Sequence, residues 1–344
     1  MMKGIQVQGA GQAAVVDLPQ PELKEGCALV KVMAASICGT DVSTFRGTNV
    51  NVSSYPIVIG HETAGIVEDV DEHNPYGIKK GDHVVLDPYL YCGECYPCSQ
   101  GRTNCCETLH CLGVHCDGSM CEYFAHPVHM LRKVPQDMPW ERVPLAEPLV
   151  ISMHGLHTCQ LKAGEHIAII GAGAIGLLAG MGALAYDAIP ILVDVVEERL
   201  ELARSFGIPH TVNPARGDAV AQIMEITKGR GVECCMEASG SDAGVRSTLD
   251  YAAYTGRIAL TGWPKHDITL PTNLITKKEL HIRGSRNGAG EFEEAIELIY
   301  TGKVPAEKII SKVVPYTQLP HMLGELTDHP GDYLKVVGLF HTEG

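Results

Sequence analysis

The sequence has no hydrophobic run that could cross a membrane, since none approaches the roughly 20 apolar residues that a spanning helix needs. Its first stretch, MMKGIQVQGAGQ, lacks the hydrophobic segment of a signal peptide. Basic residues are also scarce: 27 Lys and Arg stand against 41 Asp and Glu, a net charge of -14. Because nucleic acids and anionic membranes are bound by basic surfaces, we expect neither as a partner. A small molecule is the expected partner.

The rest of the composition is that of a folded protein. Hydrophobic residues make up 45% and charged residues 20%, and 344 residues are many for one core, so we expect two domains. We expect the protein in the cytoplasm, where thiols stay reduced. Its 13 cysteines are therefore metal ligands, catalytic thiols or small buried side chains before they are disulfides. Seven are assigned to buried side chains: Cys27, Cys111, Cys116, Cys121, Cys159, Cys234 and Cys235.

Five other cysteines crowd into the segment YCGECYPCSQGRTNCC at 91–106, where glycine and proline favour tight turns. Four thiolates at the spacing Cys-x2-Cys-x2-Cys-x7-Cys are typical of a structural zinc with tetrahedral coordination. An iron–sulfur cluster, a redox dithiol and a disulfide knot are less favoured, because no ferredoxin spacing matches and no βαβ unit frames a Cys-x-x-Cys. The candidate ligands are Cys92, Cys95 and Cys98 with either Cys105 or Cys106, which spacing alone does not separate.

Three separate fragments carry further metal-ligand types: SICGTD contains Cys38, IGHETAG contains His61 and Glu62, and PLAEPLV contains Glu147. Taken singly, Cys38 is better explained as a buried thiol at the end of a strand, and Glu147 as a charge that favours a helix N-terminus. Together they offer thiolate, imidazole and carboxylate, the ligands of a catalytic zinc that keeps one position open. We therefore predict a second zinc site.

A nucleotide-binding pattern follows. After the predicted strand EHIAII comes GAGAIG at 171–176, then an apolar helix, then the strand IPILVD, which ends at Asp194. In this context Gly171 makes the tight turn, Gly173 lets the backbone approach a pyrophosphate, and Gly176 permits close helix packing. The free amides of the helix N-terminus bind the phosphates. Asp194 would accept hydrogen bonds from the adenosine ribose, and valines rather than arginine follow it, so NAD is favoured over NADP.

Together these motifs resemble the zinc-dependent medium-chain alcohol and polyol dehydrogenases, and the resemblance covers essentially the whole chain. It includes CGTD at 38–41, GHETAG at 60–65, the cysteine loop and AEP at 146–148. The resemblance implies a catalytic zinc held by Cys38, His61 and Glu62, with Glu147 as an exchangeable or water-linked fourth partner. It also selects Cys106, rather than Cys105, for the structural zinc.

The same resemblance implies the residues that contact NAD and move the proton. Beyond the fingerprint, the implied NAD contacts are Ile175, Asp194, Arg199, Thr261, Gly262, Trp263, Ser285 and Arg286. Many relatives carry a proton-relaying histidine at the position of Ser43. Proton release is therefore expected to run through Thr40, the ribose hydroxyls and water, with His115 as a substitute.

The segments GRTNCC, LGVHCDG and GSRN are most similar to the L-galactonate and L-gulonate 5-dehydrogenases, whose substrates are sugar acids. Such a substrate needs a local cation, and Arg286 with Asn287, together with His115, are the expected substrate residues. Arg286 could equally contact cofactor or a subunit interface. Alternatives within the enzyme class are an L-threonine 3-dehydrogenase and a sorbitol-type polyol dehydrogenase. Outside it, the alternative is a non-catalytic sensor that binds zinc and NAD.

We therefore expect an α/β protein of two domains. Residues 1–148, rich in strand signals, should form a GroES-like, partly open β-barrel that carries both zinc sites and is completed by 286–344. Residues 149–285 alternate strand and helix, which predicts a Rossmann domain with a doubly wound parallel sheet. The chemistry is expected between the two domains. By analogy with relatives, we expect a homodimer or homotetramer.

Overall fold

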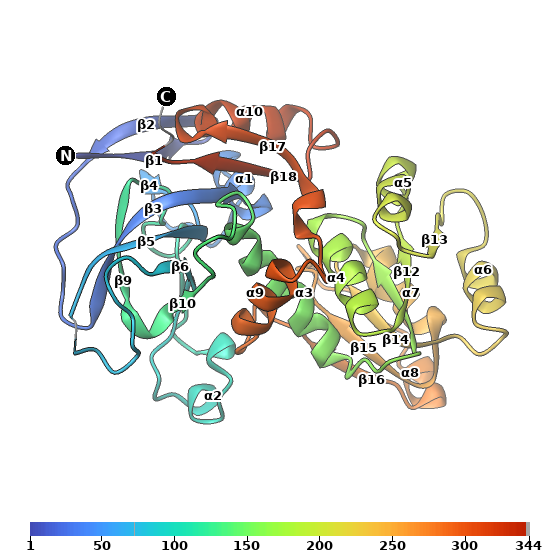
Figure 1. Cartoon of the computed structure of the whole chain (residues 1–344). Helices are drawn as coiled ribbons and strands as arrows, with labels where there is room; N and C mark the ends of the chain where they lie inside the picture. Colours follow the sequence, from blue (N-terminus) through green and yellow to red (C-terminus); the bar gives the residue numbers. More distant parts are fainter. Residues whose placement is uncertain (72, 342–344) are drawn as a thin grey trace. The chain divides into compact units, whose positions relative to one another are not determined.

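The computed structural model describes residues 1–71 and 73–341 (Figure 1). These residues form two compact units. The first comprises Met1–Glu147, Phe292–Tyr300 and the chain from Ala306 on, and the second comprises Pro148–Glu291 and Thr301–Pro305. The domain limits at 148/149 and 285/286 stay a prediction, and the observed units change over at 147/148 and 291/292. Within the described residues, no helix is both long and apolar enough to cross a membrane.

The first unit is built mainly of strands (Figure 1). Its main sheet has the strand order β10-β6-β5-β3-β18-β17, with β9 also paired to β3, and a smaller sheet has the order β2-β1-β4. Among the described strands of the main sheet, only β17 and β18 pair in parallel. The strands are β1 (Met2–Gly9), β2 (Gln12–Leu18), β3 (Cys27–Ile37), β4 (Ile57–Val58), β5 (Glu62–Val70), β6 (His83–Leu86), β7 (Tyr89–Leu90), β8 (His110–Cys111), β9 (Tyr123–Pro127), β10 (Leu131–Lys133), β17 (Ile310–Pro315) and β18 (Lys335–Leu339).

The central strand β3 forms because a small or β-branched residue stands at every second position of its first part. Ala28, Val30 and Val32 are fully buried, and the residues between them are half-buried. Its register with β5 places Ser36 opposite Glu62. The strand thus fixes the end of the sheet at which the predicted metal ligands lie.

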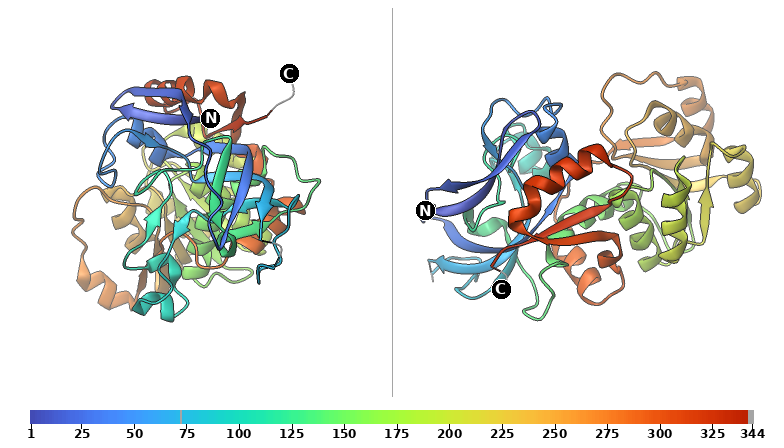
Figure 2. Two further views of the ribbon diagram at one scale, coloured as in Figure 1. Left: turned by 90° about the vertical axis from the view of Figure 1, so that its left-hand side faces the viewer. Right: turned by 90° about the horizontal axis from the view of Figure 1, so that it is seen from above.

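Short helices close the first unit. They are α1 (Gly39–Phe45), α2 (Tyr96–Ser99), α9 (Phe292–Tyr300) and α10 (Leu319–Asp328), and the long helix α3 (Ala146–Thr158) begins with the last residues of this unit. Figures 1 and 2 show α10 beside β2 and α1, and its Leu319, Met322 and Leu323 enter the same core as Ile5 of β1. A segment from the end of the chain therefore completes a core that begins at the first strand.

The second unit contains a six-stranded parallel sheet of order β13-β12-β11-β14-β15-β16, with helices packed against it (Figure 1). The strands are β11 (His166–Ile170), β12 (Ile189–Val193), β13 (His210–Val212), β14 (Val232–Glu237), β15 (Ala252–Leu260) and β16 (His281–Gly284), and the helices are α4 (Ala174–Ala185), α5 (Glu197–Ser205), α6 (Ala219–Ile226), α7 (Asp242–Tyr251) and α8 (Thr272–Lys278). The predicted α/β fold class is confirmed, and β13 is a strand that the sequence analysis did not name.

Candidate active site

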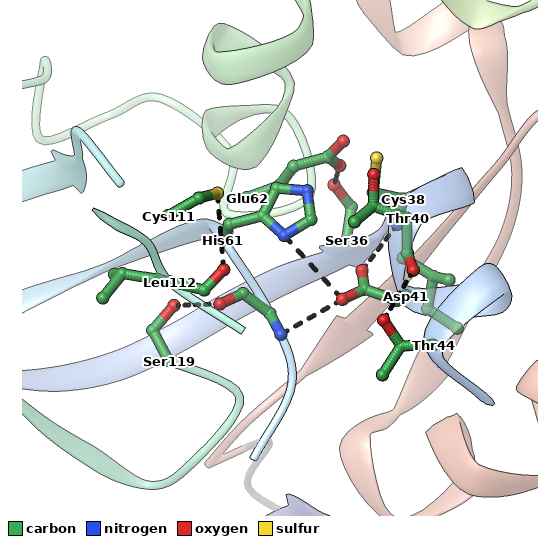
Figure 3. A network of polar contacts seen from close by, with 12 residues as sticks. Ser36, Cys38, Thr40, Asp41, Thr44, His61, Glu62, Cys111, Leu112 and Ser119 are labelled. Atoms are coloured by element: carbon green, nitrogen blue, oxygen red, sulfur yellow. Dashed lines mark hydrogen bonds and ion pairs between the residues drawn. The ribbon is translucent and has the colours of Figure 1, made fainter. Parts of the chain in front are cut away.

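Cys38, His61 and Glu62 come together where β3 ends and β5 begins (Figure 3). Cys38 follows β3 directly and is the N-cap residue of α1, and Glu62 is the first residue of β5. One ligand atom from each of the three residues lies within 4.8 Å of the other two. A sulfur, an imidazole nitrogen and a carboxylate oxygen at this spacing fit a zinc ion with an open position.

Two buried residues hold the Glu62 carboxylate. The Lys335 Nζ lies 2.7 Å from Oε1 and 2.8 Å from Oε2, and the Ser36 hydroxyl donates to Oε2. Burial lowers the pKa of Lys335, but the charge of Glu62 outweighs it and the pKa is raised, so the ammonium stays charged. Lys335 precedes Val336, which pairs with Ile37 of β3. Neither Lys335 nor Ser36 is predicted to have a role from the sequence.

Asp41 of α1 fixes the backbone on the other side of this cluster. Its Oδ2 accepts the Cys38 amide at 2.8 Å, and its Oδ1 accepts the Gly60 amide at 3.2 Å. The Nδ1 atom of His61 faces the same carboxylate at 3.8 Å and has no hydrogen-bond partner among the described residues (Figure 3). Burial lowers the pKa of His61, yet the negative charges of Asp41 and Cys38 raise it well above its ordinary value. The negative charges of Asp41 and Cys38 beside His61 favour a cation at this position, so a divalent metal ion suits the site.

Glu147 lies in the first turn of α3 and is 1% exposed. The Tyr89 hydroxyl donates to its Oε1, whereas its Oε2 is buried with no hydrogen-bond partner among the described residues. Burial, aided by the charge of Glu62, raises the pKa of Glu147 to about 7, and burial raises the pKa of Tyr89 well above its ordinary value. Glu147 is not one of the three clustered residues. Its role as a fourth zinc partner stays a prediction, and Tyr89 was missed because nothing in DPYLYC signals it.

The remaining predicted catalytic residues lie in α1 and in the segment that follows β8. Thr40 is half-buried, and the Ser43 hydroxyl donates to its carbonyl at 2.8 Å. His115 is exposed, and its Nδ1 accepts the amide of Cys111 at 2.9 Å. The prediction of buried thiols was wrong for Cys27, Cys111 and Cys116, which are half-buried. The Cys111 sulfur lies near the His61 ring (Figure 3). The proton route through Thr40 and the substitute role of His115 stay predictions.

The cysteine loop gathers four of its five thiols. Cys92, Cys95, Cys98 and Cys106 each offer a sulfur within 4.8 Å of the others, and Cys105 is not in this group. The Cys92 sulfur accepts the amide of Cys95 at 3.4 Å, and the Cys106 sulfur accepts the amide of Cys92 at 3.3 Å. The amides of Glu94 and Cys95 lower the pKa of Cys92 to about 6. Amides that favour thiolates suit a closed tetrahedral zinc site.

The glycine turn at 171–176 lies between β11 and α4. Gly171 has a φ of 101°, which a residue with a Cβ rarely adopts, and a Cβ on Gly176 would overlap the Gly171 carbonyl. The Asp194 carboxylate accepts the amides of Ala172 at 2.6 Å and Val196 at 2.8 Å. A cavity of about 270 Å³ opens beside it, lined by Ile170, Gly171, Val193, Asp194, Val195, Pro214, Ser239, Ser241, Ala243, Gly244, Ser247 and Tyr251.

The other predicted cofactor residues also lie in the second unit. Ile175 is half-buried in the first turn of α4, and Arg199 lies in α5. The amide of Ser285 donates to the Leu260 carbonyl at 2.8 Å, which brings the 261–263 and 285–287 segments side by side. In those segments the hydroxyls of Thr261 and Ser285 are buried without a hydrogen-bond partner among the described residues, and Trp263 is exposed. Contacts of Gly262, Trp263, Arg286 and Asn287 with cofactor or substrate stay predictions.

Comparison with known proteins gives this geometry its context. Residues 24–136 match the family model described as alcohol dehydrogenase GroES-like domain, and residues 174–301 match the model described as zinc-binding dehydrogenase. A relative from Haemophilus influenzae, named an uncharacterized zinc-type alcohol dehydrogenase-like protein, is 50% identical over 98% of this chain and 99% of its own. The chain belongs to the zinc-dependent medium-chain alcohol dehydrogenases. Its predicted class, an NAD-dependent zinc alcohol/polyol dehydrogenase, is confirmed at the level of this family.

Two further relatives in this dehydrogenase family carry more specific names. Sorbitol dehydrogenase of Bacillus subtilis is 30% identical over 98% of this chain and 96% of its own. An Escherichia coli protein described as a short chain alcohol dehydrogenase, solved as a complex with NADH, superposes with a TM-score of 0.91 at 30% identity, covering 98% of this chain and 99% of that one. The chain is thus similar to polyol dehydrogenases along its whole length.

Proposed function

We propose that this dehydrogenase oxidises a secondary alcohol of a sugar acid, of the L-galactonate or L-gulonate type, to a ketone with NAD. The observation that carries the proposal is the cluster of Cys38, His61 and Glu62 in a chain that also carries a glycine turn and Asp194. Zinc, when bound, lowers the pKa of an alcohol in its open position, which is what hydride loss requires. NAD, when bound, is the hydride acceptor.

The residues of this chain would divide the work as follows. Cys38, His61 and Glu62 hold the ion, and the ion pair with Lys335 fixes the orientation of Glu62. Thr40, two residues after Cys38 in the first turn of α1, would accept the alcohol proton on its hydroxyl oxygen while it donates its own hydroxyl proton towards solvent. The amides that follow Gly171 bind the cofactor pyrophosphate.

Support for NAD over NADP comes from Asp194. Its carboxylate lines the 270 Å³ cavity, and the lining residues of that cavity include no lysine or arginine. A 2′-phosphate there would face the negative charge of the Asp194 carboxylate, whereas ribose hydroxyls can donate to it. The carboxylate is already oriented by the amides of Ala172 and Val196.

Support for an anionic substrate comes from Arg286 and Asn287, which follow Ser285 in a segment beside residues 261–263. A guanidinium binds a carboxylate through two parallel hydrogen bonds, so an arginine here would favour a sugar acid over a neutral polyol. The second candidate is a sorbitol-type polyol dehydrogenase, which the 30% identity to sorbitol dehydrogenase favours.

The test is an NADH-absorbance assay of the zinc-loaded protein with L-galactonate, L-gulonate, sorbitol, xylitol and L-threonine, each with NAD and with NADP. We expect turnover with a hexonate and NAD, and Arg286→Gln should raise KM for the hexonate about tenfold or more without a similar change for sorbitol. Turnover with sorbitol alone would select the polyol candidate, and turnover with L-threonine alone would select the threonine dehydrogenase. No turnover with any substrate, despite two bound zinc ions, would contradict both sugar-based proposals.

A further inference from the structure

The contact between Tyr89 and Glu147 joins two segments that are 58 residues apart. Tyr89 stands in β7, just before the cysteine loop, and Glu147 stands in the first turn of α3. Both side chains are buried, at 7% and 1% exposure. The Glu147 carboxylate therefore has one hydrogen-bond donor among the described residues, the Tyr89 hydroxyl, and one oxygen without any.

The two buried glutamates of the site are held very differently. Both oxygens of Glu62 are bound by the Lys335 ammonium, and the Ser36 hydroxyl adds a further hydrogen bond. Glu147 is bound at one oxygen by a neutral phenol, which is a weaker partner for a carboxylate than a cation is. Glu147 is close enough to feel the charges of Glu62 and His61, yet it lies outside the three-residue metal cluster. It is the carboxylate that can exchange partners.

We propose that Tyr89 is a positioning residue that holds Glu147 away from the open position of the catalytic metal. The proposal rests on the proposed zinc-dependent function. Without the phenol hydroxyl, the buried carboxylate would lose its hydrogen-bond donor, and a bound metal ion would be a strong alternative partner for it. Four protein ligands make a closed zinc site, whereas three leave a position for substrate. Tyr89 thereby keeps the site open for the alcohol.

The test is Tyr89→Phe, measured by the rate at which a coloured chelator removes zinc from the intact protein. Two kinetic phases are expected, and the phase that is absent from Cys38→Ser belongs to the catalytic site. In Tyr89→Phe that phase should slow by about tenfold, since partners around metal ligands typically change affinity by about 10–100-fold. KM for the alcohol should rise by a similar factor, because substrate must displace a carboxylate. An unchanged or faster phase would overturn the proposal.

Two controls separate this role from a merely structural one. Tyr91 lies two residues after Tyr89, and its ring packs edge-on against His129. Tyr91→Phe removes its hydroxyl and should leave the catalytic-site phase of zinc release unchanged. In the double variant Tyr89→Phe/Glu147→Gln the slowing should disappear, because Tyr89 acts only through the carboxylate. Slowing that persists in the double variant would contradict the proposal.

A third measurement covers the case in which Tyr89→Phe does not fold. Glu147→Gln in an otherwise unchanged chain should release zinc within about threefold of the wild-type rate, because Glu147 is not a resting ligand here. Release faster by tenfold or more would show that Glu147 is a resting ligand and would overturn the inference. The chelator rates need no substrate, so an inactive substrate panel would refute the proposed function and leave this inference standing on its own measurement.

Discussion

At the scale of single residues, Cys105 and Cys106 show how neighbouring thiols differ. The Cys106 sulfur lies 3.6 Å from that of Cys92 and 3.9 Å from that of Cys95, whereas Cys105 ends a short 3-10 turn (Thr103–Cys105) and stays outside the cluster. Spacing allowed both residues as ligands. The turn decides between them because it faces successive side chains in different directions.

This difference predicts unequal effects of two conservative variants. Cys106→Ala should lose the structural zinc and lower the free energy of unfolding by on the order of several kcal/mol, since ligand loss removes metal-binding energy from the folded state. Cys105→Ala should keep both zinc ions and its stability. Metal analysis and denaturant unfolding measure the two effects, and zinc loss from Cys105→Ala instead would reverse the assignment.

Lys335 illustrates what a residue-level pattern misses. A lysine at the start of the strand KVVGL would ordinarily be solvent-exposed, yet it is 4% exposed and paired with Glu62 from 273 residues away. Its burial follows from the position of β18 next to β3, which only the completed sheet defines. A buried ammonium persists because its partner is charged and close.

At the scale of elements, the strand–turn–helix of β11, Gly171 to Gly176 and α4 follows directly from the sequence. Apolar runs give the buried strand and helix, and glycine supplies the positive φ at Gly171. Gly173 is the N-cap of α4, and a Cβ built there would meet no atom within 4 Å. Packing therefore requires glycine at 176, whereas the role of Gly173 in approaching a pyrophosphate stays a prediction.

The two glycines make a matched pair for a test. Gly176→Ala should lower the free energy of unfolding by about 1–3 kcal/mol and also weaken NADH binding, because the new Cβ overlaps the Gly171 carbonyl. Gly173→Ala should change stability by only about 0.5 kcal/mol. It should still weaken NADH binding about tenfold or more, because the pyrophosphate needs close approach to this backbone. Fluorescence titration with NADH reports binding, and normal NADH affinity in Gly173→Ala would argue against a pyrophosphate at this turn.

At the scale of the whole molecule, the candidate zinc sites and the candidate NAD site are assigned to different units. Both cysteine-containing clusters lie in the first unit, and the glycine turn with Asp194 lies in the second. The first unit is discontinuous, because α9, α10, β17 and β18 come from the end of the chain. Its stability therefore depends on contacts distant in sequence.

Addition of NADH and removal of zinc should accordingly each change the stability of one unit. NADH at about 100 times its Kd should stabilise the second unit by about 2.7 kcal/mol, roughly a hundredfold slower exchange for amides that exchange by its unfolding. Chelation of zinc should instead speed amide exchange in the first unit, foremost at 92–106. Hydrogen-exchange mass spectrometry resolves the two responses. Zinc removal that speeds exchange only in the second unit would contradict the assignment of both metal sites.

Short segments of the sequence encode several of these features. The cysteine loop and the glycine turn before α4 are readable locally, because each depends on the spacing of a few neighbouring residues. Cys38, His61 and Glu62 indicate a metal site only when they are considered together. The parallel sheet of the second unit was predictable from alternating apolar strands and helices, since that alternation has few stable solutions.

The side chains that surround those ligands come from distant segments and are defined by the folded chain. The pairing of β5 and β18 with β3 brings Ser36 and Lys335 into contact with Glu62. The position of β7 brings the Tyr89 hydroxyl to Glu147, and Cys111 lies near His61. Ser36 is 26 residues from Glu62 in the sequence, Lys335 is 273 residues from Glu62, and Tyr89 is 58 residues from Glu147. Local pattern carries no information about such pairs, because burial and partner are properties of the packed chain rather than of any one segment.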